Sequence, residues 1–379
     1  MIPRDVLTIC NNDVNKHKAL ILLGARQVGK TTLLRALSKD WENTLWLTGD
    51  ELETQKMFEN PTITRLLAEL SGVQFLIIDE AQRLPNVGLG LKIITDHLPH
   101  IQLLVTGSSA FELSNRLNES LMGRTFEYKL YPISFSEMAN YHTIKNEKQL
   151  LAYRMVYGYY PDVVMHPYDS KKILQNLIQN FLYKDMLLLE GVKKPDKIVK
   201  LLQALAFQVG NQVSYSELSR LVGMDMATVE KYITLLEQSF VLFRLGSFSR
   251  NLRTELSKSR KIYFYDNGIR NALIGNFAPV ETRTDTGALW ENFLILERLK
   301  LLHNNERWAQ RFFWRTTEQQ EVDYVEEEDG VLRAFEFKWN MASKAKISKT
   351  FSKAYPNALI SLITPDNYES FINDPHFYS

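Results

Sequence analysis

Residues 24–31 have the residue types and spacing of a loop that binds phosphate. The run Gly-Ala-Arg-Gln-Val-Gly-Lys-Thr contains Gly24 and Gly29 and ends in Lys30 and Thr31. Glycine permits backbone turns that a Cβ atom would block, so amide N–H groups can point towards phosphate oxygens. The lysine is expected to reach the β- and γ-phosphates, and the threonine hydroxyl to be a ligand of Mg²⁺. The pattern predicts a site for ATP with Mg²⁺.

The predicted nucleotide-binding residues are Gly24, Ala25, Arg26, Gln27, Val28, Gly29, Lys30, Thr31 and Thr32. An apolar run that ends in two acids, Phe75–Ile78 followed by Asp79 and Glu80, supplies the other half of the site. Carboxylates at the end of a parallel strand lie at the edge of the sheet where ligands bind. Asp79 is expected to hold Mg²⁺ through water, and Glu80 to orient or deprotonate the attacking water. The alternative is a strand that ends in two solvated acids.

Two further residues are catalytic candidates. Thr106 ends the apolar run Ile101–Thr106 and is expected to contact the γ-phosphate or the attacking water. Simple termination of the strand is the alternative. Arg124, directly before the next strand, is the favoured arginine finger for a neighbouring subunit's nucleotide, and Arg116 is a second candidate. A surface arginine is an equally good interpretation of both.

Acidic and basic residues in the last hundred positions form a second candidate site. Asp323 lies on one expected strand, and Glu336 and Lys338 share one face of the next because side chains alternate along a strand. Glu291 lies on a preceding helix. Metal-dependent phosphodiester cleavage uses two carboxylates to hold Mg²⁺ and a lysine to orient or activate water. Surface strands also often alternate acid with base, and such folds also serve as binding scaffolds.

Alternating strands and amphipathic helices must position the first site. They fill residues 1–135, which predicts an α/β layer with a mostly parallel sheet. The predicted strands are Ala19–Leu23, Thr44–Leu47, Phe75–Ile78, Ile101–Thr106 and Phe126–Leu130. Because one strand intervenes between Lys30 and Asp79 and another follows them, the acidic strand is not expected to lie next to the strand before the loop.

The middle of the chain is expected to be mainly helical. Residues 136–195 contain three predicted helices, Phe135–Tyr141, Glu147–Tyr157 and Lys171–Leu189. Residues 196–265 have the outline of a winged helix-turn-helix, a module often used to read DNA. Its predicted elements are a helix over 214–222, a turn at Gly223, a helix over Asp225–Ser239, a hairpin over Phe240–Leu245 and a strand over Lys261–Tyr265.

The charges of this module give opposite indications about DNA. The charged residues of the second helix are Asp225, Glu230, Lys231 and Glu237, a net negative set that would repel phosphates. The segment 244–261 is basic, with Arg244, Arg250, Arg253, Lys258, Arg260 and Lys261 against Glu255. A wing that clamps the DNA backbone and a packing module with a solvated basic loop are both compatible with this pattern.

The remaining elements follow the order helix, three strands, helix and strand. They are predicted at Asp285–Leu302, Arg311–Arg315, Glu321–Val325, Val331–Trp339, Ser343–Ala354 and Ala358–Thr364. Composition limits the classes of protein. The 379 residues are 45% hydrophobic and 23% charged, with a net charge of +1, which is typical of a soluble protein of several domains. The absence of an apolar run of ~20 residues and the single Cys10 predict a cytoplasmic protein without a membrane span.

Several runs resemble a bacterial and archaeal family of AAA-type ATPases. They are residues 24–31, Ile-Ile-Asp-Glu-Ala-Gln (77–82), Val-Thr-Gly-Ser-Ser (105–109), the run 123–135, Tyr-Gly-Tyr-Tyr-Pro-Asp (157–162) and Lys-Ile-Tyr-Phe-Tyr-Asp-Asn-Gly (261–268). The resemblance implies an ATPase core at 1–135, a helical lid at 136–195, a winged helix at 196–265 and a nuclease-like domain at 266–379. In that last domain, Asp323, Glu336, Lys338 and Glu291 resemble the PD-(D/E)XK nuclease signature.

The expected fold class is therefore α/β: a parallel-sheet P-loop core with a helical lid, a winged helix and a restriction-endonuclease-like domain. The expected function is ATP hydrolysis with Mg²⁺ that repositions a module facing nucleic acid, with DNA contacted through segment 244–261. Assembly into a homo-oligomer would allow an arginine finger to act between subunits. The alternative is a nucleotide-dependent switch that binds a protein partner and does no chemistry on nucleic acid.

Overall fold

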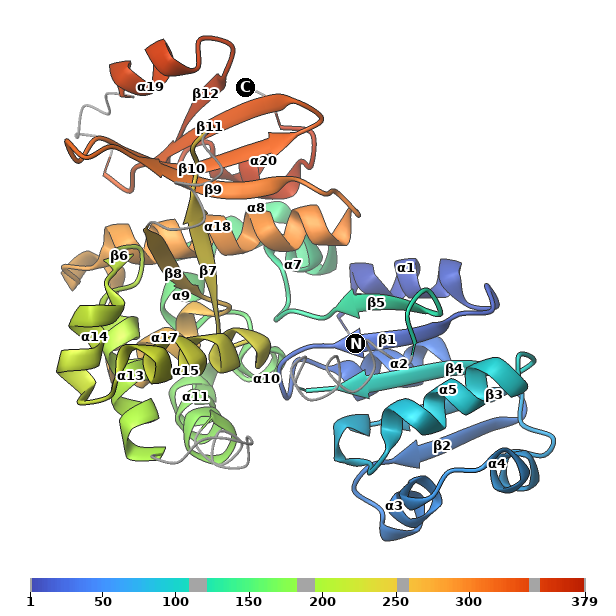
Figure 1. The fold of residues 1–379 in the computed structure, drawn as a ribbon. Coiled ribbons are helices and arrows are strands. Elements are labelled where there is room, and N and C mark those ends of the chain that lie inside the picture. Colours follow the sequence, from blue (N-terminus) through green and yellow to red (C-terminus); the bar gives the residue numbers. More distant parts are fainter. Residues whose placement is uncertain (1, 109–120, 183–194, 251–258, 341–347, 378–379) are drawn as a thin grey trace. The chain divides into compact units, whose positions relative to one another are not determined.

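The structure is a computed structural model that describes residues 2–108, 121–182, 195–250, 259–340 and 348–377 (Figure 1). The chain divides into two compact units. The amino-terminal unit comprises Met1–Tyr131 with Gln238–Phe240, and the carboxyl-terminal unit comprises Pro132–Glu237 with Val241–Ser379. Among the described residues, no helix is both long and apolar enough to span a bilayer. The finer division into four parts stays a prediction.

The amino-terminal unit is built on a five-stranded parallel sheet in the order β2-β3-β4-β1-β5. Its strands are β1 (Ala19–Leu23), β2 (Thr44–Thr48), β3 (Phe75–Asp79), β4 (Gln102–Gly107) and β5 (Thr125–Lys129). Strands β1 and β4 are buried along their whole length, as expected for parallel strands covered on both faces. The predicted strands agree within one residue at each end. Strand β4 separates β3 from β1, as the sequence predicts.

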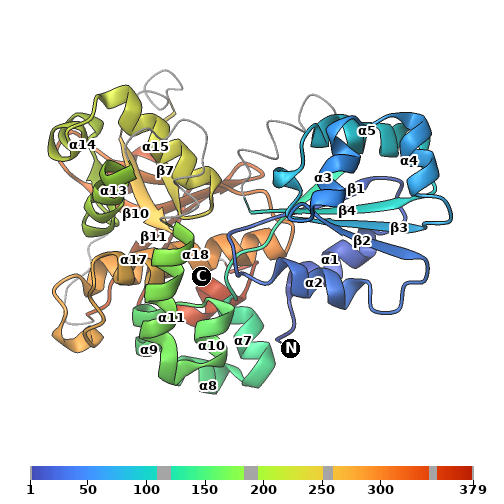
Figure 2. The ribbon, with the colours of Figure 1, turned by 90° about the horizontal axis from the view of Figure 1, so that it is seen from below.

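Helices cover both faces of this sheet. They are α1 (Asp5–Asp13), α2 (Lys30–Leu37), α3 (Leu52–Glu59), α4 (Ile63–Glu69) and α5 (Val87–His97). Figure 2 shows α4 and α5 on one face of the sheet, with α1 and α2 on the other. A short 3-10 turn, Ala81–Arg83, directly follows β3. The unit is thus a three-layered α/β fold whose strands all point their carboxyl ends to one edge.

The carboxyl-terminal unit begins with helices. They are α7 (Phe135–His142), α8 (Ile144–Gln149), α9 (Leu151–Tyr157), α10 (Pro161–Met165), α11 (Ser170–Asn176), a π-helix (Leu177–Leu182), α13 (Pro195–Phe207), α14 (Tyr215–Val222) and α15 (Met226–Gln238). The prediction of one helix over 147–157 was wrong, because α8 ends at Gln149 and α9 begins at Leu151. The predicted helix over 171–189 extends partly outside the described residues. Gly223 ends α14 in the left-handed conformation, which confirms the predicted turn.

A seven-stranded mixed sheet, in the order β12-β11-β10-β9-β7-β8-β6, dominates this unit. Its strands are β6 (Gln212–Val213), β7 (Leu242–Ser247), β8 (Arg260–Phe264), β9 (Gln310–Arg315), β10 (Glu321–Glu328), β11 (Val331–Phe337) and β12 (Leu359–Ile363). The predicted hairpin over 240–245 was wrong, because β7 is a single strand that pairs antiparallel with β8. Strand β7 also pairs parallel with β9. The predicted wing and the carboxyl-terminal strands therefore share one sheet.

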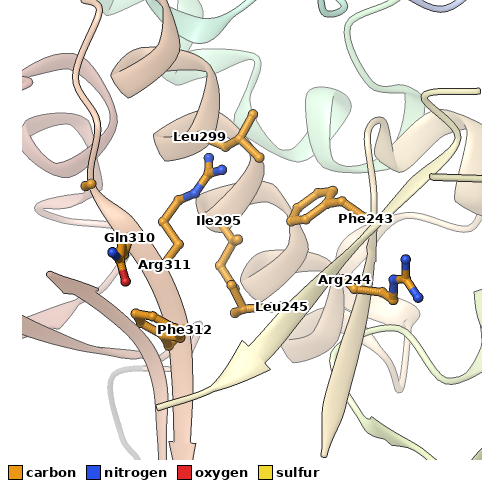
Figure 3. A pocket seen from close by; sticks show the side chains of 9 residues that line it. Phe243, Arg244, Leu245, Ile295, Leu299, Gln310, Arg311 and Phe312 are labelled. Carbon is orange, nitrogen blue, oxygen red and sulfur yellow. The ribbon is translucent and has the colours of Figure 1, made fainter. Parts of the chain in front are cut away.

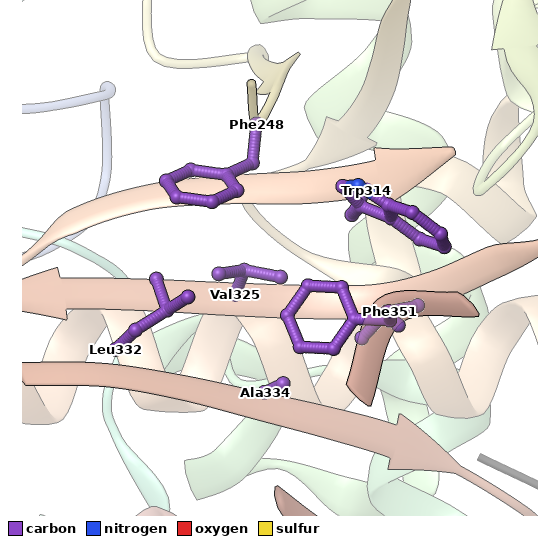
Figure 4. Packing of buried hydrophobic residues seen from close by; sticks show 7 residues of the cluster. Phe248, Trp314, Val325, Leu332, Ala334 and Phe351 are labelled. Atoms are coloured by element: carbon purple, nitrogen blue, oxygen red, sulfur yellow. The ribbon is translucent and has the colours of Figure 1, made fainter. Parts of the chain in front are cut away.

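The described part of this unit also contains the α-helices α17 (Asn267–Leu273), α18 (Thr286–Asn304), α19 (Lys349–Ala354) and α20 (Tyr368–Asn373). An apolar cluster joins α19 to the strands (Figure 4). Its buried members are Phe248, Trp314, Val322, Val325, Leu332, Ala334 and Phe351. A second set of aromatic contacts joins the sheet to α20, where Phe371 packs against Tyr324, Phe335 and Phe337. The sheet thus has a hydrophobic layer against each of these helices.

Asp266 ties two distant segments of this unit together. Its carboxylate caps α17 by accepting the Ile269 N–H at 3.0 Å, and it also accepts the Tyr159 N–H at 2.7 Å. A Cβ atom at Gly158, whose φ is +73°, would lie 2.1 Å from the Asp266 Oδ1, so only glycine fits. Burial raises the pKa of Asp266 to about 6. The runs 157–162 and 261–268 therefore form one packing contact.

Candidate functional site

The loop over residues 24–31 connects the end of β1 to the start of α2. Gly24 begins it where the chain passes the backbone of Leu130, since a Cβ atom there would lie 2.2 Å from the Leu130 carbonyl oxygen. Gly29 precedes α2 with a φ of +99°, a conformation that other residues rarely adopt. Both glycines are thus required by the local backbone. The N-terminus of α2 and its N–H groups then face the loop, an arrangement suited to anions.

Lys30 is buried inside this loop, with 5% of its surface exposed. Its ammonium group donates hydrogen bonds to the carbonyl oxygens of Gly24 and Ala25, at 2.9 and 3.0 Å. The Glu80 Oε1 lies 4.0 Å away. Burial lowers the pKa of Lys30, which the carboxylates of Glu80 and Asp79 partly oppose. The ammonium group of Lys30 is thus held mainly by neutral carbonyl groups of the loop.

Three oxygen-bearing side chains converge on the end of β3. The Thr31 hydroxyl donates to the Asp79 Oδ2 at 2.7 Å, and the Thr106 hydroxyl donates to the Asp79 Oδ1. A hydroxyl and a carboxylate at neighbouring positions are the hard oxygen ligands that Mg²⁺ prefers. The residues present therefore fit the metal ion that the sequence predicts for Thr31 and Asp79.

Glu80 has an unusual backbone conformation directly after β3. Its φ of 51° and ψ of 42° lie in the left-handed region, which costs a non-glycine residue free energy. Its N–H donates to the Thr106 hydroxyl at 3.0 Å. Gly49 packs against it so closely that a Cβ atom there would lie 2.3 Å from the Glu80 carbonyl oxygen. Conformations of this kind concentrate at functional sites.

Two residues that sequence reasoning missed hold the Glu80 carboxylate. Its Oε2 accepts a hydrogen bond from the Gln82 amide at 2.6 Å and one from the Ser108 hydroxyl at 3.1 Å. The Gln82 amide also donates to the Ser108 hydroxyl at 2.8 Å. Both residues lie in runs that carry the family resemblance, 77–82 and 105–109. Their polar side chains beside Asp79 and Thr106 were the signal that could have found them.

Arg4 also contacts the loop and was not predicted. Its guanidinium donates to the Val28 carbonyl oxygen at 2.9 Å and to the Tyr131 carbonyl oxygen at 2.6 Å. It therefore links the loop to Tyr131, which is the last residue of the segment Met1–Tyr131. No motif connects Arg4 with residues 24–31, so sequence gave no signal.

Arg124 does not join this group in its own chain. Its carbonyl oxygen accepts the Ala19 N–H, at the amino ends of β1 and β5, whereas the loop lies at their carboxyl ends. Its side chain donates to Asp96 at 2.6 Å and is 44% exposed. A role towards a neighbouring subunit stays a prediction, and Arg116 lies outside the described residues.

The carboxyl-terminal candidates lie where β10, β11 and α18 meet. Glu336 accepts a hydrogen bond from Lys338 at 2.7 Å, as the predicted strand alternation requires. Asp323 occupies an irregularity in the pairing of β9 with β10, and its Oδ2 accepts the Phe337 N–H at 2.8 Å. Burial raises the pKa of Asp323 well above its ordinary value, and the charges of Glu291 and Glu336 raise it further. The structure thus brings the predicted acids close together.

A lysine that was predicted elsewhere enters this group from β8. Lys261 forms ion pairs with Glu291, at 2.9 Å, and with Glu321. The Tyr263 hydroxyl donates to the same Glu291 oxygen at 2.5 Å. Sequence reasoning missed both Glu321 and Tyr263. We call Glu291, Glu321, Asp323 and Glu336 the carboxylate cluster.

The basic segment 244–261 is not a uniform exposed surface. Arg244 bonds to Glu237 through its backbone N–H and its guanidinium. Arg250 is 65% exposed at its side chain and lies 3.8 Å from Glu327. The expectation that Lys261 belongs to the surface of a wing was wrong, because this residue is 1% exposed and ion-paired. Arg253 and Lys258 lie outside the described residues.

A cavity of about 330 Å³ lies between β7, α18 and β9 (Figure 3). It is lined by Phe243, Arg244, Leu245, Ile295, Leu299, Ala309, Gln310, Arg311 and Phe312. None of the residues of the two predicted sites lines it, and the basic segment 244–261 contributes Arg244 and Leu245. The two candidate sites are therefore separate from this cavity.

Comparisons with known families divide the chain into three matches. Residues 16–139 match the model of a family described as an AAA domain. Residues 148–280 match "Domain of unknown function (DUF8612)", and residues 286–374 match "Domain of unknown function (DUF4143)". The first match, together with the parallel sheet and the loop geometry, supports an AAA-type P-loop ATPase-like domain in this chain.

Relatives extend over nearly the whole chain. An uncharacterized protein of Mycobacterium tuberculosis is 27% identical over 386 residues, which cover 98% of this chain and 82% of that protein. An uncharacterized protein of Methanocaldococcus jannaschii is 21% identical and covers 91% of this chain and 81% of its own length. The solved structure of a Walker-type ATPase of Pyrococcus abyssi aligns with a TM-score of 0.49 at 16% identity, covering 72% of this chain and 96% of that one.

Proposed function

We propose that the chain hydrolyses ATP with Mg²⁺ at the carboxyl edge of the amino-terminal sheet. The observation that supports this most strongly is the arrangement around the end of β3. Thr31 and Asp79 are in contact, and Glu80 beside them is fixed by two side-chain donors. A carboxylate held in this way beside the Mg²⁺ ligands is suited to orient or deprotonate the attacking water.

Each residue has a distinct task in the proposed reaction. Residues 24–32 bind the phosphates through backbone N–H groups, and Lys30 leaves its carbonyl partners to contact the β- and γ-phosphates. Thr31, and Asp79 through water, would hold Mg²⁺, which when bound neutralises charge on the phosphate oxygens.

Glu80 accepts a proton from the water that attacks the γ-phosphorus, and the products are ADP and phosphate. Thr106 donates to Asp79 and accepts from the Glu80 backbone, so it holds these two residues in register.

Glu80→Gln is the direct test. The amide cannot accept the proton, so the rate of ATP hydrolysis should fall by about 10²–10⁴-fold while ATP binding persists. Glu53→Gln, on the exposed surface of α3, is the matched control and should change neither. Hydrolysis by Glu80→Gln at the rate of the unaltered protein would refute the proposal.

We further propose that the nucleotide state repositions the carboxyl-terminal unit, through a lid formed by residues 136–195 and a winged helix at 196–265. In this proposal the carboxyl-terminal module faces DNA, and Arg250 supplies part of the contact. ATP hydrolysis measured with and without single- and double-stranded DNA, while cleavage is followed in the same samples, tests the coupling. Salt-dependent DNA binding that falls on reversal of the charges of Arg250, Arg253 and Lys258 would support it.

A second candidate function is a nucleotide-dependent switch that binds a protein partner and does no chemistry on nucleic acid. The charges of the described residues favour it: Arg244 is already paired with Glu237, and Lys261 is buried. This candidate predicts no DNA-stimulated hydrolysis and no nucleotide-dependent DNA binding. Either effect would eliminate it.

Arg124 as an arginine finger belongs to the same proposal and requires a homo-oligomer. Since its side chain lies at the amino edge of its own sheet, it can act only on the nucleotide of another copy. Arg124→Ala should then lower the rate per chain, and inactive Glu80→Gln chains with an intact Arg124 should rescue it. Equal rates for Arg124→Ala and the unaltered protein at every protein concentration would exclude this role.

A further inference from the structure

The carboxylate cluster contains a cation that belongs to the protein itself. Lys261 extends from β8 towards α18 and β10, and its ammonium group contacts Glu291 and Glu321. Its side chain is 2% exposed, and the ring of Phe313 lies 5.4 Å from the ammonium nitrogen. A lysine buried to this degree needs charged partners, because an isolated ammonium ion is strongly destabilised away from water.

Strand pairing on both sides of β8 fixes the backbone of Lys261, so its side chain stays directed at the cluster. Strand β8 lies between β6 and β7, so Lys261 is paired with Gln212 on one side and with Leu245 on the other. The acceptors are fixed as well. Glu291 also accepts from Tyr263, and the second oxygen of Glu321 lies 3.3 Å from Arg315. Lysine and carboxylates thus form one connected network.

The charges of the cluster are nearly balanced without a metal ion. The cluster contributes four negative charges, and three cationic side chains lie among them. These side chains are Lys261, Arg315 and Lys338, so the formal charge of the group is −1. With Lys261 in place, no three Asp, Glu, His or Cys side chains within the described ranges are grouped so that they could hold a metal ion. Loss of its ammonium group would free Glu291 and Glu321 to approach Asp323. A metal ion bound by Glu291 would have to displace the ammonium group of Lys261.

We propose that Lys261 is the resident cation of the carboxylate cluster and takes the place of a divalent metal ion there. The acids that resemble a nuclease signature then serve to join β8, α18 and β10, and not to cleave phosphodiester bonds. The inference does not depend on ATP hydrolysis, since every residue in it belongs to the carboxyl-terminal unit.

Lys261→Met tests the proposal, because methionine keeps most of the volume and removes the charge. In nucleotide-free protein carrying Asp79→Asn, which weakens the other predicted metal site, Mn²⁺ binding is followed by electron paramagnetic resonance. The parent protein, which carries Asp79→Asn alone, should bind no Mn²⁺ at millimolar concentrations. Lys261→Met should gain one Mn²⁺ per chain, and adding Asp323→Asn should abolish this gain.

Lys338→Met is the matched control, since it removes the more exposed lysine of the same cluster and leaves Lys261 in place. It should gain no Mn²⁺ site. One bound Mn²⁺ in the parent protein that disappears in Asp323→Asn would overturn the proposal, as would a folded Lys261→Met variant that binds none. If Lys261→Met does not fold, the titration of the parent protein and of its Asp323→Asn variant decides alone.

Discussion

Two lysines of this chain are almost equally buried but have different partners. The Lys30 side chain is 4% exposed and bonds to two backbone carbonyl oxygens, with its nearest recorded carboxylate 4.0 Å away. The Lys261 side chain is 2% exposed and is ion-paired to two carboxylates. Neutral carbonyls release an ammonium group easily when a phosphate offers full negative charge. The comparison indicates that the partners of a buried lysine, more than its burial, decide whether it can serve a ligand.

The strongest test of this comparison is the same substitution at both positions. Lys30→Met should lower kcat/KM for ATP hydrolysis by about 10²–10³-fold, because a cation that stabilises transferred charge is lost. Lys261→Met should leave kcat/KM within about threefold, or about 0.7 kcal/mol. Steady-state phosphate release measures both. A large loss of hydrolysis in Lys261→Met, with the protein still folded, would break the comparison.

Lys261→Met, which should hardly affect hydrolysis, should have a large effect on the stability of the fold. Lys261→Met leaves the partly exposed Glu291 and Glu321 without their buried counter-ion. We expect it to destabilise the carboxyl-terminal unit by about 2–3 kcal/mol, somewhat less than the ~3–5 kcal/mol that breaking a fully buried pair costs. Lys338→Met should cost less than about 1 kcal/mol, since that ion pair is partly exposed. Differential scanning calorimetry of each variant measures the shift of the melting transition. Similar melting temperatures for the two variants would show that Lys261 does not hold the cluster together.

The buried acids of the carboxyl-terminal unit should also make its stability depend on pH. Burial raises the pKa of Asp266 to about 6, against roughly 3.9 in an unfolded chain, so the folded state binds more protons between these values. The stabilisation is complete below the lower pKa and is lost as the pH rises through 6. The loss approaches about 3 kcal/mol.

Asp266→Asn should remove the contribution of this carboxyl group to the pH dependence, which melting temperatures between pH 4 and 8 would measure. The exposed Asp329→Asn, in the turn before β11, serves as the control and should keep it. Parallel melting curves for the unaltered protein and Asp266→Asn at every pH would contradict the assignment to this carboxyl group.

The smallest expected effect concerns the residues that hold Glu80. Ser108→Ala removes one of the two side-chain donors to its Oε2 and should lower kcat about tenfold, or ~1.4 kcal/mol, with little change in KM. Ser38→Ala, at the end of α2, should change neither constant. A rise in KM at constant kcat would mean that Ser108 binds nucleotide and does not position the carboxylate.

The strands and the loop of the amino-terminal unit could be predicted well from sequence because their signals are local. The loop over 24–31 is contiguous, and Asp79 and Thr106 each end an apolar strand whose boundaries are visible. The positions of Ser108, Gln82 and Arg4 could not be predicted, since their role depends on which way each side chain points. Polar residues beside a motif look alike in sequence whether they contact its carboxylate or water.

The carboxyl-terminal cluster was predicted only in part for a different reason. Glu336 and Lys338 are two residues apart, so strand alternation alone places them together. Lys261 looked like one more basic residue of an exposed segment. Lys261 is buried because β8 pairs with β6 on one side and with β7 on the other. Glu291 and Glu321, from distant parts of the chain, also pack against it. Contacts over 30 and 60 residues leave no periodic signal in one sequence.

The parallel pairing of β7 with β9 limits where a shorter fragment of this protein can begin. The family match that begins at residue 286 includes β9 but excludes β7 and β8. A fragment that starts there would expose β9 as a raw edge strand, with Phe312 and Phe313 no longer paired to Gly246 and Ser247. Unpaired edges of this kind recruit other chains and aggregate. The smallest soluble fragment that contains the carboxylate cluster should therefore start before β7.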